Sequence, residues 1–423
     1  MSRVLAFCFL LLAAVLGFIH NDGRPSWAPF AASEGAHEES VEVASDAVPE
    51  LKPSAIKGKL ASQSAVQDPR MDWLPDTGAA SVHAASLIGL KDGGIRAFWF
   101  AGSREGAPDV VINTAVLNSK SNTWGASSVV MDRVAAEKGL SRYIAKLGNP
   151  VPARLADGRL QLFFVTVSIG GWAGSSISTI FSEDEGATWS RPQRLIASPF
   201  FNLSTLVKSP AVTFADGRLG LPAYHEWIGR FGEFLRLDAV QVLDKRRMSA
   251  GRSAIQPVMF VNDAQNAAAL FRQTRGSGQV KQIPVSATQD AGQTWQSLGD
   301  LEILNPNSAV AGVLLQNGAR LLALNNIEAG RYRLVLMMSK PKSGEWHIVQ
   351  TIENDEALPE LERKEFSYPY LLSAHGGDVH LVYTWDRKKI RHVYFSSAWL
   401  DRAYKQLPSS TENQSNGESR ETQ

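Results

Sequence analysis

"FSEDEGATWS" at residues 181–190 is the stretch that decides the fold, and a looser copy, "TQDAGQTWQS", occurs at residues 288–297. Both contain an acid, one residue, Gly, one residue, Thr and Trp. Such a phrase suits a tight turn between two strands, because Asp accepts backbone N–H bonds, Gly adopts a positive φ and Trp packs over the turn. Two worn copies at residues 118–124 and 339–346 keep the Trp. The repetition predicts a structural role for the two acids rather than a catalytic one.

Strand-like segments fill the regions between these turns. Short apolar alternations such as "LQLFFVTV" and "DVHLVYTW" are separated by Gly, Asp and Asn turns, and no long stretch has a helical period. Six dipeptides lie between apolar runs, about 55 residues apart, and favour tight hairpins: Asp92-Gly93, Asp157-Gly158, Asp216-Gly217, Asn262-Asp263, Asn317-Gly318 and Gly376-Gly377. This spacing predicts an all-β, six-bladed β-propeller with about four strands per blade. A pair of β-sandwiches is the alternative.

Composition narrows the class of function. The 423 residues carry a formal net charge of +1, with eleven Trp and eight Tyr. Near-neutral charge without a basic cluster argues against nucleic acid as a partner, because phosphate binding is mainly electrostatic. The sequence has no two-His helical motif, no Cys cluster and no Asp-rich calcium loop, so we expect neither a metal nor a cofactor. The aromatic residues would suit a carbohydrate site, although most should lie in the core.

The two ends of the chain differ from its middle. One Arg followed by about fifteen apolar residues predicts a secretory signal or membrane anchor within residues 1–30. We expect residues 31–72 to be a disordered tether, residues 73–402 the propeller, and residues 403–423 a disordered tail. The only cysteine, Cys8, lies in the apolar segment, so the exported part would contain no disulfide. These features predict a monomeric periplasmic or extracellular protein, held at the inner membrane if the segment is not cleaved.

The repeated turns resemble the aspartate box of sialidases and other BNR-repeat proteins, and the resemblance extends over about residues 75–400. The carrying segments are "HAASLIGLKDGGIRAFWFAGSREGAPDVVI", "IQPVMF", "NPNSAVAGVLLQNGARLLALNN" and "FSYPYLL…VHLVYTWDR". The chain is similar to the sialidase (neuraminidase) superfamily, and within it to a branch of predicted sialidase-domain proteins of bacteria and plants. Because aspartate boxes lie on the propeller rim, the resemblance implies that Asp184 and Asp290 are structural.

The resemblance also implies roles for individual residues. Sialidases hold the substrate carboxylate with three arginines, and use an Asp as acid/base and a Tyr nucleophile activated by a Glu. A neutral nucleophile avoids repulsion with an anionic sugar. Carried over to this chain, the pattern implies acid/base chemistry for Asp109, a nucleophilic role for Tyr368, orientation of an anionic group by Arg104, and carboxylate binding by Arg272 and Arg331, with Arg275 and Arg333 as the substitutes.

Two positions depart from the sialidase pattern. His83 stands where the first arginine would lie, and Gln256 stands where the activating Glu would lie. An imidazole offers one donor where a guanidinium offers a fork, so carboxylate capture would be weaker. Without the Glu, Tyr368 has no evident base, and a phenol with a pKa of about 10 is a poor nucleophile at neutral pH. His83 could take that proton, so we expect it to be catalytic and Gln256 to contact substrate.

Three further features lie close to these segments. "YHEW" at residues 224–227 could form a sugar platform with an acid, and Lys208 could add positive charge to the site. We expect Asp386 and Arg387, at the end of "YTWDR", to form a surface pair.

The residues together predict an exported exo-glycosidase that acts on a terminal acidic sugar, such as a sialic acid, a related nonulosonic acid or a uronic acid. A polysaccharide lyase is one alternative, because His and Tyr can abstract a proton beside a uronate whose charge arginines neutralise. The other is a non-catalytic propeller that binds an envelope polysaccharide. In each case the expected partner is an acidic glycan.

Overall fold

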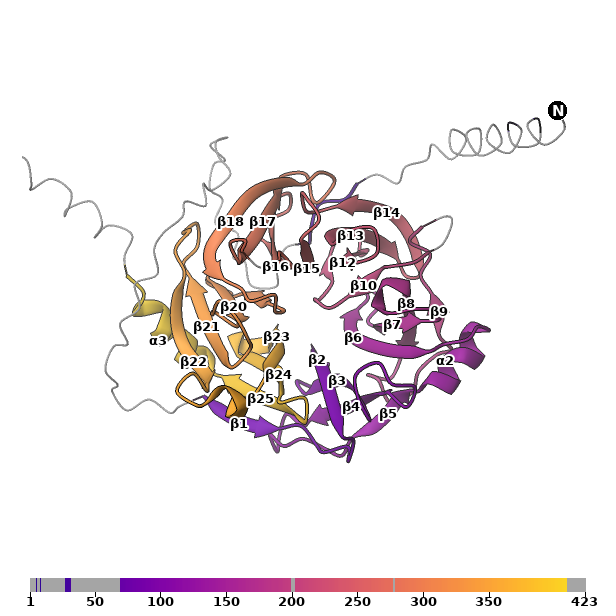
Figure 1. Ribbon diagram of the computed structural model, residues 1–423, viewed down its shortest axis with the longest axis horizontal. Coiled ribbons are helices and arrows are strands. Elements are labelled where there is room, and N and C mark those ends of the chain that lie inside the picture. Colours follow the sequence, from indigo (N-terminus) through magenta and orange to yellow (C-terminus); the bar gives the residue numbers. More distant parts are fainter. Residues whose placement is uncertain are drawn as a thin grey trace, which may run out of the picture.

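Six antiparallel sheets surround a central axis and form a six-bladed β-propeller, as predicted (Figure 1). The computed structural model describes Leu5, Cys8 and residues 27–31, 69–198, 202–276 and 278–408. The first strand of each blade lies nearest the axis, and the following strands lie progressively farther out.

The strands of the blades have the following bounds. Blade 1 contains β2 (Ser81–Gly89), β3 (Ile95–Gly102), β4 (Val111–Leu117) and β5 (Ser128–Met131). Blade 2 contains β6 (Lys146–Arg154), β7 (Leu160–Val167), β8 (Ser175–Ser182) and β9 (Gln193–Arg194). Blade 3 contains β10 (Leu206–Val207), β11 (Val212–Thr213), β12 (Leu219–His225), β13 (Phe231–Asp238) and β14 (Gln241–Arg247). Blade 4 contains β15 (Ala254–Val261), β16 (Ala267–Gln273), β17 (Gln282–Thr288) and β18 (Gln296–Leu304). Blade 5 contains β19 (Ala311–Leu314), β20 (Arg320–Leu324), β21 (Arg333–Ser339) and β22 (His347–Asn354). Blade 6 contains β23 (Phe366–Ser373), β24 (Val379–Trp385), β25 (Lys389–Phe395) and β1 (Arg70–Trp73).

The ring closes within blade 6, where β1 pairs with β25 in the register Arg70↔Tyr394 to Trp73↔Arg391. The last blade therefore takes three strands from the C-terminal end of the chain and its outermost strand from the N-terminal side. Two helices complete the described structure: α2 (Arg133–Leu140), after blade 1, and α3 (Ser397–Lys405), after β25.

The six predicted dipeptide turns all join the first strand of a blade to the second. In the turn of blade 1, Asp92 Oδ1 accepts the Gly94 N–H at 2.9 Å, and Gly93 has φ 83°. In blade 2, Asp157 Oδ1 likewise accepts the Arg159 N–H at 3.0 Å. Because strands alternate in direction, these turns share one end of the propeller with the turns between third and fourth strands. We call this end the turn face.

The repeated phrase forms the turn between the third and fourth strands, in blades 2 and 4. Asp184 Oδ1 accepts the Thr188 N–H at 2.8 Å, and Asp184 Oδ2 accepts the Thr188 hydroxyl at 2.6 Å. Trp189 then packs edge-on against Phe98 of the neighbouring blade, with ring centroids 5.8 Å apart. Asp290 makes the same bonds to Thr294. Both carboxylates hold backbone on the turn face, which agrees with the structural role expected from the sequence.

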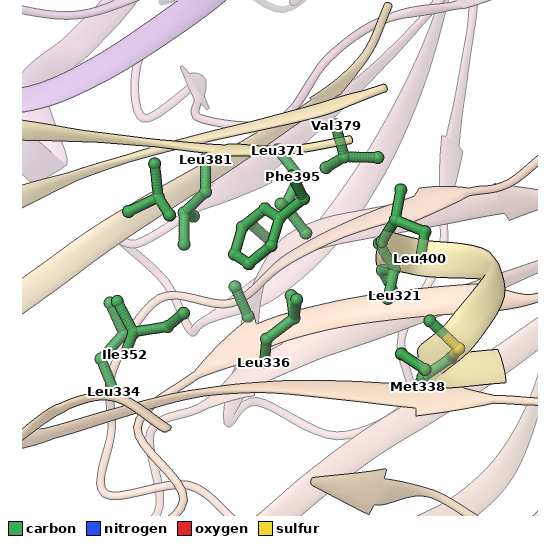
Figure 2. Close-up of a cluster of buried hydrophobic side chains, with 14 of the residues drawn as sticks. Leu321, Leu334, Leu336, Met338, Ile352, Leu371, Val379, Leu381, Phe395 and Leu400 are labelled. Carbon is green, nitrogen blue, oxygen red and sulfur yellow. The ribbon is translucent and has the colours of Figure 1, made fainter. Parts of the chain in front are cut away.

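The core consists of six apolar clusters, built from the faces of adjacent blades. Inner strands are buried on both faces because each blade is covered by a neighbour on either side, and all eight residues of β7 are buried. Figure 2 shows the cluster between blades 5 and 6, where Leu336 of β21 faces Leu381 of β24 and Phe395 of β25. Leu400 of α3 extends this cluster beyond the strands.

The folded part differs from the predicted segments at three places. β1 begins at Arg70, inside the range expected to be a tether. Residues 27–31, at the end of the predicted signal, pack onto blades 3 and 4, where Phe30 is 1% exposed. α3 runs to Lys405, three residues beyond the predicted end of the propeller. Most of the apolar run, the tether and the tail lie outside the described residues. Within the described ranges no helix is long and apolar enough to cross a membrane.

Candidate functional site

Each blade carries the same backbone irregularity where its chain enters the first strand. One non-glycine residue there has a positive φ, which is uncommon for such residues and marks a constrained position. In β2, β6, β15 and β23 the pairing with the second strand shifts across this residue, as in a β-bulge. In blades 3 and 5 the residue lies just before the first strand. The six residues are Ala84, Asn149, Ser204, Gln256, Asn307 and Tyr368, with φ between 43° and 63°.

Proline follows the bulge residue in three blades, as Asn149-Pro150, Gln256-Pro257 and Tyr368-Pro369. Proline has no N–H and therefore fits where the ladder of hydrogen bonds is interrupted. The six residues form a ring around the axis at the end opposite the turn face. We call them the bulge ring, and we call this end of the propeller the site face.

Two tyrosines and one amide lie at the centre of the bulge ring. Gln256 Nε2 donates to the Tyr224 hydroxyl at 3.3 Å and to the Tyr368 hydroxyl at 3.4 Å. Asn149 Nδ2 donates to the Tyr224 hydroxyl at 3.3 Å. Burial raises the pKa of Tyr224 well above its usual value, so this phenol stays protonated at neutral pH. Polar groups from blades 2, 3, 4 and 6 thus meet at one point.

Arg272, at the end of β16, is a half-buried cation among neutral partners. Its Nε donates to Asn307 Oδ1 at 2.8 Å, and its Nη1 donates to Gln256 Oε1 at 3.3 Å. Among the described residues, no carboxylate lies within 4.0 Å of its guanidinium. Holding such a charge away from water is costly unless an anion compensates it. Its position suits an anionic ligand.

Arg331 lies beside Arg272 but is already paired. It donates to the Asn307 carbonyl at 3.2 Å and forms an ion pair with Glu365 at 3.0 Å. Burial alone would raise the pKa of Glu365, but hydrogen bonding from Arg387 and the charges of both arginines lower it to about 2. Arg387 also pairs with Glu105 of blade 1 at 2.7 Å. Arg387 is therefore not the surface pair with Asp386 that the sequence suggested, since it bridges blades 6 and 1 on the site face.

His83 lies beneath the tyrosine of blade 6. Its ring centroid is 4.3 Å from that of Tyr368, and the side chain is 1% exposed. Burial lowers the pKa of His83 to about 4, partly opposed by the charge of Glu105. Neither ring nitrogen has a hydrogen-bond partner among the described residues. His83 is therefore a neutral imidazole in contact with Tyr368 at neutral pH.

Asp109 and Arg104 lie on the exposed loop that follows β3. Both oxygens of Asp109 accept hydrogen bonds from Ser103, one from its N–H and one from its hydroxyl, each at 2.9 Å. These bonds, with a smaller effect of Arg104, lower the pKa of Asp109. The hydrogen bonds of the described residues connect neither side chain to Tyr368 or Arg272. A general acid at neutral pH needs a raised pKa instead.

Glu226, unlike Asp109, has a pKa that its surroundings raise. It follows β12 in "YHEW", and its N–H donates to Ser204 of the bulge ring at 2.8 Å. Burial raises the pKa of Glu226, against the opposing charges of Arg272 and Arg230. The next residue, Trp227, is 56% exposed. Glu226 therefore lies within electrostatic reach of Arg272 and next to an exposed aromatic face, although the roles expected from the resemblance did not include Glu226.

Lys208 crosses the propeller axis below the bulge ring. From blade 3, its ammonium group donates to the carbonyls of Val310 in blade 5 and Pro369 in blade 6, at 2.7 and 2.6 Å. Burial, followed by the charge of Arg272, lowers the pKa of Lys208 to about 7. It adds positive charge to the floor of a small cavity that Tyr368 and Asn149 also line. Lys208 is therefore a buried lysine and not a solvated one at the end of a strand.

The structure therefore joins four of the seven predicted site residues directly, namely His83, Gln256, Arg272 and Tyr368. Arg331 is connected to them through Asn307, whereas Arg104 and Asp109 remain on the exposed loop. In the described part of the chain, no group of three or more His, Cys, Asp or Glu could hold a metal ion.

A larger cavity, of about 1190 Å³, opens on the turn face. Its lining comes mainly from glycine-rich turns and includes Gly94, Thr213 and Gln316. The arginines, the tyrosines and the glutamates described above are absent from this lining. The larger cavity is therefore not the one that contains the candidate catalytic residues. Those residues lie on the site face, at the opposite end of the propeller axis.

Comparison with known proteins identifies a matching family and several solved structures with a similar fold. The model of the family described as BNR repeat-like domain matches residues 93–381. The Hadza microbial sialidase Hz136 has a similar structure, with a TM-score of 0.60 at 16% identity over 75% of this chain and 66% of the sialidase. The intramolecular trans-sialidase from Ruminococcus gnavus gives a TM-score of 0.59 at 14% identity, over 78% of this chain and 98% of that enzyme. The Penicillium chrysogenum α-L-arabinanase gives 0.54 at 15% identity, over 78% and 98% of the two chains. The sequence matches no curated protein.

The fold and the match together define a BNR-repeat propeller that shares its fold with sialidases. The chain belongs to the BNR repeat-like domain family. At 14–16% identity, the likeness to sialidases and to the arabinanase establishes a shared fold and leaves substrate and reaction to be argued from the site.

Proposed function

We propose that this protein is an exported glycoside hydrolase that removes a terminal acidic sugar, of the sialic acid or uronic acid type, from a glycan. The observation that carries the proposal is Arg272. Its guanidinium is half-buried on the site face, and its hydrogen-bond partners among the described residues are the neutral side chains of Asn307 and Gln256. A sugar carboxylate is an anion of the right charge and shape for such a fork.

The remaining groups supply the parts of a displacement at the anomeric carbon. Tyr368 acts as nucleophile or stabilises the developing oxocarbenium ion, while its hydroxyl is oriented by Gln256. His83 is the neutral base in contact with Tyr368. An acid must protonate the leaving oxygen, and Glu226 is favoured for this because its pKa is raised, whereas that of Asp109 is lowered.

Replacement of Arg272 by Met tests the carboxylate contact. We expect turnover of acidic glycosides to fall by at least 100-fold, in line with loss of a charge-assisted pair. Arg275→Met is the matched control, because Arg275 lies three residues away and pairs with Asp300 instead. A panel of sialosides, other nonulosonides and uronides identifies the sugar. Equal activity of the two variants would contradict the proposal.

A second pair of variants separates the two candidate acids. A phenolic leaving group such as 4-methylumbelliferone needs little protonation, whereas a sugar leaving group needs it. If Glu226 is the acid, Glu226→Gln loses turnover of the natural linkage but retains much of its turnover of the phenolic glycoside. Asp109→Asn should then leave the ratio of the two rates unchanged. The opposite result assigns the acid to Asp109.

Two other functions remain as candidates, each on one observation. Polysaccharide lyase action is favoured by the contact of a neutral His83 with Tyr368, and it would generate an unsaturated product that absorbs in the ultraviolet. Binding without turnover is favoured by Gln256, which places an amide beside Tyr368 where a sialidase has a carboxylate. Tight binding of an acidic glycan with no product of either kind would support this last function.

A further inference from the structure

A short peptide ahead of the propeller docks on its turn face. The N–H of Phe30 donates to the Ala264 carbonyl at 2.8 Å, and the N–H of Ala31 donates to the Thr213 carbonyl at 2.9 Å. In return, the Pro29 carbonyl accepts the Ala215 N–H at 2.8 Å. The peptide thus pairs three backbone groups at the turns of blades 3 and 4. We call residues 27–31 the docked peptide.

Aromatic contacts strengthen the docking. Phe30 stacks on Phe214, with ring centroids 5.3 Å apart and an interplanar angle of 19°. Trp27 Nε1 donates to the Ala291 carbonyl at 2.9 Å, in the repeated turn of blade 4. The Arg236 guanidinium lies over the Trp27 ring at 5.1 Å. Phe30 is buried in the same apolar cluster as Phe214 and Phe234, so the docked peptide is part of the folded propeller.

The docked peptide follows the N-terminal apolar run closely in the sequence. The apolar run ends at Ile19, and only seven residues, 20–26, separate it from Trp27. An extended chain spans at most about 3.5 Å per residue, so these residues reach no farther than about 25 Å. A membrane that held the apolar run would therefore lie close to the turn face.

We propose that the docked peptide couples an N-terminal membrane anchor to the propeller and orients it, with the turn face toward the bilayer and the site face away from it. The bulge ring and Arg272 then face outward, where a glycan chain can approach without crossing the lipid headgroups. The partner on the turn face is a lipid surface. This orientation follows from the docked peptide and the short distance along the chain to the apolar run, and it does not require the proposed hydrolase activity.

The orientation can be measured on the full chain in lipid vesicles. In a Cys8→Ser background, Ala156→Cys places a single thiol on the turn face, and Ala329→Cys places one on the site face. Both alanines are exposed. Each variant is labelled with a fluorophore and reconstituted in vesicles that contain a lipid with a nitroxide headgroup. We expect the label at residue 156 to be quenched several-fold more than the label at residue 329.

Phe30→Asp in the same backgrounds tests the coupling itself. We expect this variant to remain in the vesicle fraction but to lose the difference in quenching, whereas Phe30→Leu keeps it. Circular dichroism melting shows whether each variant is folded. Equal or reversed quenching of the unmodified docked peptide overturns the proposal. Recovery of the mature protein outside the membrane fraction, with its chain cut before Trp27, also overturns it.

Discussion

Arg272 and Arg331 illustrate how neighbouring charges acquire different roles. Both lie on the site face and both contact Asn307, but Glu365 already neutralises Arg331. An ion pair inside the protein competes with an ionic ligand, so Arg331 contributes shape and orientation more than free charge. Arg272 bonds to the amides of Asn307 and Gln256 instead, and no carboxylate among the described residues compensates its charge, which is what the proposed binding of an acidic sugar requires. The neutral Gln256 is what leaves it uncompensated.

Gln256→Glu gives a direct prediction for the reaction. A carboxylate at this position would accept the Tyr368 proton and pair with Arg272, as the resemblance to sialidases implies. We expect hydrolysis of an acidic glycoside to rise by about 100-fold, the lower range for a well-placed base. Steady-state rates on the best substrate measure this, with Gln256→Leu as the control of similar size. A folded Gln256→Glu variant without gain would argue against Tyr368 as the nucleophile.

Lys208→Met should show a pH-dependent loss of stability. The pKa of Lys208 is lowered to about 7 in the folded protein but lies near about 10.5 when unfolded, so the unfolded state binds more protons between these values. Wild-type stability from this group therefore rises with pH across that window, by up to about 1.4 kcal/mol per pH unit. The methionine variant lacks this rise.

Urea unfolding at several pH values measures the Lys208 effect. We expect the difference in unfolding free energy between wild type and Lys208→Met to grow by about 2 kcal/mol from pH 7.5 to pH 9. Lys91→Met, at an exposed lysine on the turn face, is the control. A difference that is constant with pH would mean that Lys208 keeps an ordinary pKa.

At the level of elements, the turns were predictable and the bulge ring was not. A dipeptide such as Asp92-Gly93 contains its whole signal in adjacent residues, because Gly supplies the positive φ. Ala, Gln and Tyr, the residue types at positions 84, 256 and 368, do not indicate a positive φ. Only the proline after Gln256 and after Tyr368 indicates that the strand pairing is interrupted. A local pattern can predict a hairpin but cannot place six strand entries around one axis.

Some contacts at the candidate site join residues that are far apart in the sequence, and local sequence patterns do not predict them. The pair Arg387–Glu105 joins residues 282 positions apart, so nothing near "YTWDR" indicated it. The resemblance implies roles for Asp109 and Arg104 because the family pattern places an acid and an arginine on that loop. The side chain of Ser103, which holds Asp109, is a purely local feature that the motif does not report.

Asp290→Ala tests the separation of the two faces at the level of one element. Loss of the bonds to Thr288 and Thr294 should lower the unfolding free energy by about 1 kcal/mol. Because the turn lies on the turn face, activity or ligand affinity should be unchanged. Thermal melting and ligand titration measure the two quantities, and Gln289→Ala, at an exposed neighbour, is the control. A loss of affinity in Asp290→Ala at full stability would show that the faces communicate.

On the scale of the whole molecule, three histidines of the described residues, His83, His380 and His392, are almost fully buried and have strongly lowered pKa values. Burial lowers the pKa of His83 and of His380 to about 4, and lowers that of His392 further. His380 Nδ1 of β24 and His392 Nε2 of β25 are 2.9 Å apart, and β25 is the strand that pairs with the closing strand β1. Protonation would place a charge in this sheet and another beneath Tyr368.

The protein should therefore lose stability as the pH falls below about 6.5. The folded pKa values are below the unfolded ones, so the stabilisation is complete above about 6.5 and is lost toward pH 4. Three protons correspond to as much as about 4 kcal/mol per pH unit. Melting between pH 7 and pH 4.5 measures the slope, and His83→Phe should reduce it by up to about 1.4 kcal/mol per pH unit, the contribution of one proton. An unchanged slope would indicate that His83 is protonated in the folded state.

The bulge ring has a consequence for how such a protein could change its specificity over generations. Its six positions hold Ala, Asn, Ser, Gln, Asn and Tyr in one shared backbone conformation. The repeated turns that specify the architecture lie at the other end of the molecule, so exchanges in the ring need not disturb them. The side chains at the six positions can therefore be exchanged one at a time without a change in the propeller architecture. Gln256 is the ring position that departs from the sialidase pattern, and His83, directly before Ala84 of the ring, departs from it as well. Both changes would alter which acidic glycan fits the site.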